Sequence, residues 1–373
     1  MNRADRDAPS RAAGIAPRLL MVSVGLLVAC GPATATPPPA TSASPSALPT
    51  ARSTDANASP TLSPAASSAP EPSAVALEIR EFGVPAGSHP HDVSPATDGG
   101  VWYTGQRSGV LGHLDPDSGT VREIPLGNGS SPHGVITGPD GAAWITDSGL
   151  NAIVRVDAAT DAVTAFPLPA DRARSNLNTA VFDRSGTLWF TGQSGVYGRL
   201  DPASGAVEVF DDPEGRGPYG IATTPAGDVW YASLAGSHIA RVDPASGAAT
   251  IVEPPTPGQG ARRVWSDSAG RVWVSEWETG HVAVHDPADG SWREWRLPGD
   301  APMAYAVFVD DRDIVWLTDF GANAIVRFDP ATERFDSAML PTAGAAVRQL
   351  HGRPGEVWGA ESGLDRLVVV TGG

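Results

Sequence analysis

The segment Gly141-Ala-Ala-Trp-Ile-Thr-Asp147 decides the fold, because close copies of it recur along the C-terminal part of the chain. Each copy starts at a Gly or Asp turn residue and carries one tryptophan in a short apolar run. Successive tryptophans are 42, 45, 41, 43, 43 and 42 residues apart, and they are Trp102, Trp144, Trp189, Trp230, Trp273, Trp316 and Trp358. A period this regular indicates seven structural repeats.

Four short runs of β-forming residues make up each repeat. The tryptophan run is followed by a second apolar run such as AIVRVD at 152–157, a third such as AVTAFPL at 162–168, and then a run that opens the next unit, such as PYGI at 218–221. Short strands that follow one another between turns are typical of a propeller blade. The sequence therefore predicts an all-β fold, a seven-bladed β-propeller of four-stranded antiparallel blades. The tryptophans are expected to pack between blades and to take no part in chemistry.

The two ends of the repeat region predict how the ring closes. Residues 77–84 (LEIREFGV) resemble the run that forms the outermost strand of a blade, but they precede the first repeat. Residues 366–370 match the third strand of a blade, and no run for a fourth strand follows them in this sequence. Because a closed ring hides strand edges, we expect the N-terminal strand to pair with 366–370 in the last blade.

The first 75 residues differ from the repeats. Residues 1–29 have a basic start and an apolar run, LLMVSVGLLVA at 19–29, which is short for a membrane span and predicts a signal peptide. The sequence ending at Cys30, Leu-Val-Ala-Cys, resembles a lipoprotein lipobox, so this only cysteine is expected to be lipidated; a lone buried cysteine is the alternative. Residues 30–75, rich in Pro, Ala, Ser and Thr, predict a disordered tether before a propeller at 76–373. We therefore expect an extracytoplasmic protein that contacts the cell membrane through its lipid anchor alone.

Composition excludes several classes of function. The formal charge of −16 argues against a nucleic-acid partner. All basic residues are arginine, which excludes a Schiff-base or phosphate-loop lysine. No Walker, Rossmann, HExxH or CxxC pattern occurs, so no organic cofactor is expected. Recurrent Asp-Pro-x-Ser-Gly segments, such as 201–205, fit hairpin turns better than calcium loops. We expect a monomer with a small-molecule or peptide ligand.

Function is expected at repeat positions where the residue type differs between repeats but is mostly polar. One such position lies eleven residues before the tryptophan, at the start of the innermost strand, and its residues are His91, His133, Asn178, Tyr219, Arg262 and Tyr305, with Arg348 in the looser last repeat. Another lies three residues after the tryptophan, and its acidic members are Asp147, Glu276, Asp319 and Glu361. The start of a blade's first strand and the end of its second lie at the same end of the blade, so both sets are expected at one mouth of the central channel. Of the other histidines, His113, His238, His281 and His285 are expected at the surface, and His89 and His351 are left unassigned.

These residues predict a polar ligand site. The four carboxylates, Asp147, Glu276, Asp319 and Glu361, are the expected ligands of a divalent cation, Mg²⁺ or Ca²⁺. His133 is the candidate base and His91 the acid or orienting partner, because an unperturbed imidazole titrates near neutral pH. Arg262 and Arg348 are expected to hold an anionic or carbonyl group of the substrate. The other expected substrate-binding residues are Asn178, Tyr219 and Tyr305. The alternative is a mouth that holds water or binds a ligand without turnover.

The repeat resembles that of the streptogramin B lyase (virginiamycin B lyase) family over residues 77–373. The resemblance rests on the unit at 132–156, which runs from Pro-His-Gly-Val through Trp-Ile-Thr-Asp to Asn-Ala-Ile-Val-Arg-Val, and on its copies at 217–221 and 323–327. It implies a seven-bladed propeller and a Mg²⁺-assisted elimination that opens a cyclic depsipeptide at its ester. A related ester- or lactone-cleaving activity and a non-catalytic binding propeller are the alternatives.

The sequence departs from that family at the functional motif. The family places a His, a Glu-Pro-His and a further Glu in the last two blades, where this chain has Tyr305, then Ala346 and Arg348, and finally Glu361. Rotated by two blades about the near-sevenfold axis, the motif falls on His91, on Ser131-Pro132-His133 and on Asp147. This registration restores both histidines and one carboxylate, but Ser131 leaves Mg²⁺ one hard ligand short.

Overall fold

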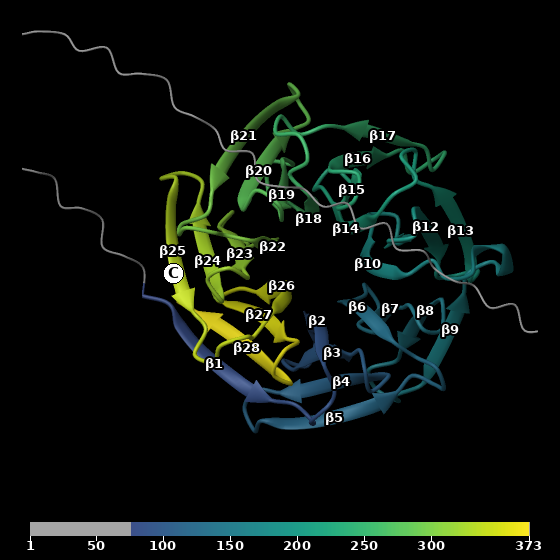
Figure 1. Ribbon diagram of the computed structural model, residues 1–373. Coiled ribbons are helices and arrows are strands. Elements are labelled where there is room, and N and C mark those ends of the chain that lie inside the picture. Colours follow the sequence, from purple (N-terminus) through teal and green to yellow (C-terminus); the bar gives the residue numbers. More distant parts are fainter. Residues whose placement is uncertain (1–75, 373) are drawn as a thin grey trace, which may run out of the picture. The chain divides into compact units, whose positions relative to one another are not determined.

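The computed structural model describes residues 76–372, which form a ring of seven four-stranded antiparallel sheets (Figure 1). Each sheet is one blade, and the predicted fold class is confirmed. The expected signal segment, Cys30 and the tether at 30–75 lie outside the described residues. Within 76–372, no helix has the length and hydropathy of a membrane-spanning segment.

Blades 1 to 4 follow one another along the chain, each from its innermost strand outward. Blade 1 consists of β2 (Pro90–Pro95), β3 (Val101–Gly105), β4 (Val110–Asp115) and β5 (Thr120–Pro125). Blade 2 consists of β6 (Pro132–Thr137), β7 (Ala143–Asp147), β8 (Ala152–Val156) and β9 (Val163–Pro167), and the short helix η1 (Ala170–Arg172) follows it. Blade 3 consists of β10 (Leu177–Phe182), β11 (Leu188–Gly192), β12 (Val196–Asp201) and β13 (Ala206–Asp211). Blade 4 consists of β14 (Pro218–Thr223), β15 (Val229–Ser233), β16 (His238–Val242) and β17 (Ala249–Val252).

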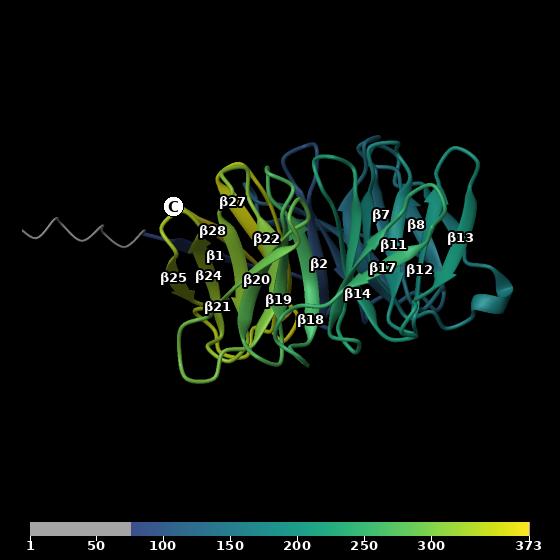
Figure 2. The ribbon, with the colours of Figure 1, turned by 90° about the horizontal axis from the view of Figure 1, so that it is seen from above.

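Blades 5 to 7 complete the ring. Blade 5 consists of β18 (Ala261–Ser266), β19 (Val272–Glu276), β20 (His281–Asp286) and β21 (Ser291–Arg296). Blade 6 consists of β22 (Ala304–Val309), β23 (Val315–Asp319), β24 (Ala324–Asp329) and β25 (Arg334–Met339). Blade 7 consists of β26 (Val347–Arg353), β27 (Glu356–Glu361), β28 (Arg366–Thr371) and, outermost, β1 (Glu78–Gly83). In the side view of Figure 2 the strands run between two faces of the ring, with connecting loops at both.

The N-terminal strand closes blade 7, as expected. β1 pairs antiparallel with β28, from Glu78 opposite Thr371 to Gly83 opposite Arg366, and it lies outside β28 in Figure 1. Arg366 Nη1 also donates a hydrogen bond to Glu81 Oε2 at 2.5 Å. Segments from the two ends of the described chain thus share one sheet, so the outer edge of blade 7 depends on β1.

The tryptophan of each repeat packs against the next blade, which confirms its expected packing. All seven indoles are at most 2% exposed. Trp102 belongs to a core cluster with Val135 and Ile145 of blade 2, and Trp358 belongs to one with Val101 of blade 1. Each interface between blades therefore has its own apolar core, and truncation of one such indole to alanine costs about 3–5 kcal/mol.

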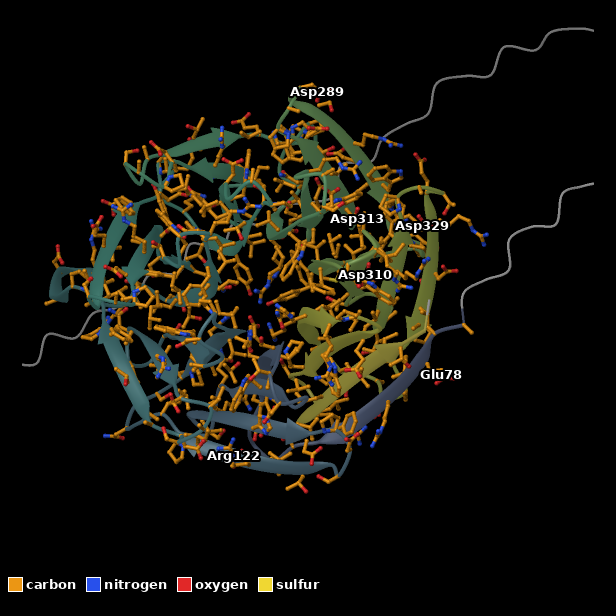
Figure 3. The ribbon with its side chains drawn as sticks, turned by 180° about the vertical axis from the view of Figure 1, so that it is seen from behind. Glu78, Arg122, Asp289, Asp310, Asp313 and Asp329 are labelled. Atoms are coloured by element: carbon orange, nitrogen blue, oxygen red, sulfur yellow. The ribbon has the colours of Figure 1, made fainter. Side chains whose placement is uncertain are left out.

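Charged side chains occupy the outer strands, as Glu78 on β1 and Arg122 on β5 show in Figure 3. Two histidines that were expected at the surface are buried instead, because the third strand of a blade packs against its neighbours. His238 is 2% exposed, with Nε2 3.7 Å from Asp212 Oδ2. His285 is 5% exposed, and its ring centroid lies 4.8 Å from that of Trp292.

Candidate functional site at one mouth of the channel

A β-bulge in the innermost strand of every blade determines which residues reach the channel. In blade 1, Pro90 pairs with Gly105 and Val93 pairs with Tyr103, so two residues of β2 lie opposite one residue of β3. A register shift occurs at the same place in β6, β10, β14, β18, β22 and β26. A bulge re-aims the side chains next to it. Several blades consequently contribute two adjacent polar residues to the channel rather than the one that the repeats predicted.

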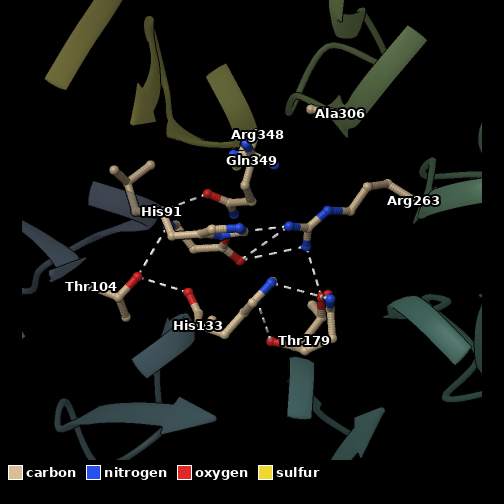
Figure 4. Close-up of polar contacts among 12 residues, drawn as sticks. His91, Thr104, His133, Thr179, Arg263, Ala306, Arg348 and Gln349 are labelled. Carbon is tan, nitrogen blue, oxygen red and sulfur yellow. Dashed lines mark hydrogen bonds and ion pairs between the residues drawn. The ribbon is translucent and has the colours of Figure 1, made fainter. Parts of the chain in front are cut away.

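Hydroxyl groups two residues after the tryptophan of a repeat stabilise these bulges and connect neighbouring blades through hydrogen bonds. Thr104 Oγ1 accepts the backbone N–H of Asp92 at 3.1 Å and donates to the carbonyl oxygen of His133 in the next blade at 2.7 Å (Figure 4). Ser275 Oγ does the same with the N–H of Arg263 and the carbonyl oxygen of Tyr305, at 3.1 and 2.7 Å. The site residues therefore stand on backbone that is cross-linked around the ring.

The part of the site nearest the mouth, its outer layer, consists of aromatic rings and two guanidinium groups. The guanidinium carbon of Arg262 lies 3.5 Å from the ring centroid of Tyr305 and 4.7 Å from that of Trp277. Tyr305 stacks on Phe320 with ring centroids 4.7 Å apart, and its hydroxyl is 2.6 Å from that of Tyr219. Trp277 and Phe320 are partly exposed at the mouth and directly follow the ends of β19 and β23. This arrangement offers a flat apolar surface beside a cation.

Neither arginine of the outer layer is paired with a carboxylate of residues 76–372. Arg262 Nη2 donates to the Tyr219 hydroxyl at 3.2 Å, and Arg348 Nη1 donates to the Tyr305 hydroxyl at 3.3 Å. Nε of each arginine is buried and has no hydrogen-bond partner among the described residues. The mouth therefore has excess positive charge and unused donors, which favours an anion.

The inner layer contains an ion pair that spans the channel (Figure 4). Arg263 Nη2 lies 3.1 Å from Asp92 Oδ1, and Arg263 Nη1 donates to Thr179 Oγ1 at 2.7 Å. The side chains of Arg263 and Asp92 are 5% and 2% exposed. One guanidinium thus links blade 5 to blades 1 and 3 deep in the channel.

The two predicted histidines lie together in the inner layer but have different partners. Their ring centroids are 3.7 Å apart. His133 Nδ1 is 3.2 Å from the carbonyl oxygen of Asn178, and its Nε2 is 3.3 Å from the Asn178 amide nitrogen. A carbonyl oxygen can only accept, so Nδ1 of His133 carries the proton and Nε2 is occupied as an acceptor. His91 Nδ1 bonds to Asp92 Oδ1 at 2.8 Å, which leaves Nε2 of His91 without a hydrogen bond to the described residues.

Burial determines the protonation of these groups. Burial lowers the pKa of both His91 and His133 well below the usual value, and Arg263 adds to the effect on each ring. Both rings are therefore neutral near pH 7. Burial and the Tyr305 hydroxyl raise the pKa of Tyr219 to about 12. Burial also acts to raise the pKa of Tyr305, but Arg262 and the two other nearby guanidiniums outweigh it and lower that pKa overall.

The structure does not bring the four predicted metal-binding carboxylates together. Asp147 Oδ1 accepts the N–H groups of Ser131 and Leu150, and Asp319 holds its own turn through the N–H groups of Met303 and Gly321, so both cap loops. The remaining two face outer strands: Glu276 lies near Glu294 of β21, and Glu361 lies near Glu81 of β1. Burial and these neighbouring carboxyls raise the pKa of Glu276 and of Glu361 to about 7. All four residues lie at the predicted ends of their strands, but none of the four carboxylates belongs to a group of metal-ligating side chains within 76–372.

The residues of the channel do not fit Mg²⁺ or Ca²⁺. Within 76–372, the one group of at least three metal-ligating side chains is His91, Asp92 and His133. These hard cations prefer oxygen ligands, and this group supplies one carboxylate and two imidazoles. Arg263 already lies within 3.5 Å of both oxygens of that carboxylate, so a dication there would meet a fixed positive charge.

Several residues of the site were not found from the sequence. Asp92 and Arg263 each follow a predicted site residue, and Trp277 and Phe320 each follow a predicted acidic residue. For Asp92 and Arg263, the signal in the sequence was the repeat position directly after the predicted one, which is polar in some blades and small in others. A bulge was needed to bring that position into the channel.

The fold and this cluster of side chains define a class of protein: a closed seven-bladed propeller with polar residues gathered at one mouth of its channel. The profile of the virginiamycin B lyase family matches residues 73–289, which is more than half of the chain, so the chain belongs to this family.

Solved structures agree with this assignment at the level of the fold. A streptogramin B lyase structure is 22% identical, with 80% of this chain and 98% of that chain covered and a TM-score of 0.73. Virginiamycin B lyase from Staphylococcus aureus is 20% identical, with 79% and 99% covered and a TM-score of 0.72. YCF48 bound to D1 peptide is 14% identical, with 79% and 95% covered and a TM-score of 0.63. No curated protein matches the chain.

Proposed function

We propose that the channel mouth binds a small molecule that carries a carboxylate and a planar apolar part, without a metal ion. The observation that carries this proposal is the pair of partly exposed arginines, Arg262 and Arg348, whose charge no carboxylate within 76–372 neutralises. A ligand carboxylate would supply both the missing charge and acceptors for the unused N–H donors. The rings of Trp277 and Phe320 would cover the apolar part of the ligand.

Calorimetric titration with 1-naphthoate tests this proposal. Loss of one charge-assisted hydrogen bond corresponds to a tenfold to hundredfold weaker affinity. We therefore expect Arg262→Gln and Arg348→Gln each to weaken binding of 1-naphthoate by at least about tenfold. Arg107→Gln, at an exposed arginine in the loop after β3, is the control and should leave the affinity unchanged. A dependence on Mg²⁺ that EDTA abolishes, or equal binding by all variants, would contradict the proposal.

The hydrogen bonding of His91 favours a second candidate, an elimination at the same mouth. His91 Nε2 is available as a base, and Asp92 holds the opposite nitrogen in the donor state. In this reaction His91 takes the proton from a carbon that lies between an activating carbonyl group and the carbon bearing the alkyl oxygen of the ester. The electron pair of that C–H bond forms a C=C bond between these two carbons, the alkyl C–O bond of the ester breaks, and the leaving carboxylate departs with the bonding pair. Arg262 and Arg348 would stabilise the negative charge on the carbonyl oxygen. His91 thereby replaces His133 as the preferred base.

Mass spectrometry distinguishes this elimination from hydrolysis. The intact protein should be incubated with a streptogramin B and a panel of lactones, with Mg²⁺ and separately with EDTA. Elimination gives a ring-opened product of unchanged mass, whereas hydrolysis adds one water. We expect His91→Asn to abolish conversion and His113→Asn, on the outer part of blade 1, to preserve it. If no compound of the panel is converted, the elimination is wrong and the binding function stands alone.

A further inference from the structure

The opposite mouth of the channel contains a cavity of about 400 Å³, where the innermost strands end. It is lined by the last residues of β6, β10, β14 and β18, which are Thr137, Phe182, Thr223 and Ser266. Ile136, Val181, Ile221 and Trp265 give the wall its apolar character. Small-molecule sites in proteins typically enclose about 300–1,000 Å³ behind mostly apolar walls, and this cavity falls within that range.

None of the residues that line this cavity is charged. Thr179 and Gln349 line the cavity and also lie beside the ion pair in the network of polar contacts (Figure 4). Thr179 Oγ1 accepts from Arg263 Nη1, and Gln349 Oε1 accepts the backbone N–H of Val93 at 2.9 Å. A charged molecule in the cavity would lose its hydration and gain no counter-charge, which is costly. The two mouths of the channel therefore differ in the charge of the ligand that they can accept.

One polar atom of the cavity wall is left without a partner. His351 lines the cavity, and its buried Nδ1 has no hydrogen bond to any described residue. Its ring is held between Trp265 and Phe308, with ring centroids 5.3 and 5.6 Å away. Burial lowers the pKa of His351 to about 4, so the ring is neutral at physiological pH. A buried polar nitrogen without a partner costs free energy, and a hydrogen bond from a ligand would recover it.

We propose that this cavity is a second binding site, and that it takes a neutral, planar aromatic molecule with one hydrogen-bonding group, of the phenol or indole class. Trp265 and Phe182 offer ring faces and edges to a flat ligand. His351 and Gln349 offer hydrogen bonds to its polar group. The lack of charged side chains excludes carboxylates, which distinguishes this site from the arginine-lined mouth.

Calorimetric titration of the full-length protein with 1-naphthol tests the second site. We expect one saturable binding event. Val181→Arg places a charge on the partly exposed wall, and Thr223→Trp fills the cavity from its rim; each should weaken binding at least tenfold. His351→Phe keeps the aromatic packing and removes the nitrogen, which should weaken binding about three- to tenfold. Arg348→Gln, at the opposite mouth, should leave the affinity for 1-naphthol unchanged.

The charged analogue separates this proposal from the function proposed above. 1-Naphthoate should bind Val181→Arg and Thr223→Trp as tightly as the parent protein, because its site lies at the other mouth. The inference is overturned if 1-naphthol shows no saturable binding, if neither cavity variant weakens it, or if Arg348→Gln weakens it as much as the cavity variants do. Circular dichroism of each variant confirms that it is folded, and having two independent cavity variants keeps the test decisive if one of them misfolds.

Discussion

Arg263→Met removes the guanidinium that spans the channel and keeps a side chain of similar length. It would leave the carboxylate of Asp92, which is 2% exposed, buried without its main counter-charge. Breaking a buried ion pair by removing one partner costs about 3–5 kcal/mol. For a domain of this size, that loss corresponds to a fall in melting temperature of roughly 5–8 °C. Thermal unfolding followed by circular dichroism measures it directly.

Two further variants make this prediction specific. Arg241→Met breaks an Arg–Asp ion pair of blade 4 whose side chains, Arg241 and Asp228, are 56% and 31% exposed. Because this pair is exposed to solvent, its loss should lower the free energy of unfolding by no more than about 1 kcal/mol. The double variant Asp92→Asn with Arg263→Met removes both charges and should recover at least half of the loss. Equal melting temperatures for Arg263→Met and Arg241→Met would refute the reasoning, as would a double variant no more stable than Arg263→Met.

Three other predictions concern pH, ring closure and the N-terminal segment. The pKa of Glu361 is raised to about 7 in the folded protein, above its unfolded value of 4.5, so folding favours the protonated form and stability falls as the pH rises through this interval. Glu361→Gln should therefore raise the free energy of unfolding by about 1–3 kcal/mol at pH 8 and have little effect at pH 4, and equal effects at both values would disprove the assignment. Deletion of residues 76–84 removes β1 and exposes the edge of β28, so the truncated chain should aggregate or fail to fold; a monomer with the parental melting temperature would contradict this. Cys30→Ser should move the protein out of the membrane fraction or stall its maturation, and identical fractionation of variant and parent would argue against the lipid anchor.

The fold could be predicted from the sequence because it depends on local and repeated signals. Seven tryptophans at a nearly constant spacing define the blades, and each indole packs as its position in the repeat indicates. Even the pairing of β1 with β28 followed from a strand-like segment that had no partner in its own repeat. A blade cannot bury its faces alone, so the repeat itself requires a ring.

The candidate site could be predicted only in part. The repeats place His91, His133, Tyr305 and Arg262 at one mouth, and the structure brings them together there. The predicted carboxylates were placed at the correct end of their strands, but Glu276 and Glu361 turn toward outer strands. Spacing along a strand indicates the height of a residue in the blade and does not indicate the direction of a side chain beside a bulge.

The sequence by itself determined the number of blades, the strand order, the closure of the ring and the mouth at which the polar residues gather. Only the tertiary structure decided that Arg263 pairs with Asp92, 171 residues away, and that the four carboxylates predicted to bind a metal have other neighbours. The physical reason is that the repeat pattern is a property of one blade and its neighbours, whereas the charge of the channel depends on side chains that meet across the ring. Their distances, and the burial that determines which of them stay charged, exist only once all seven blades are closed.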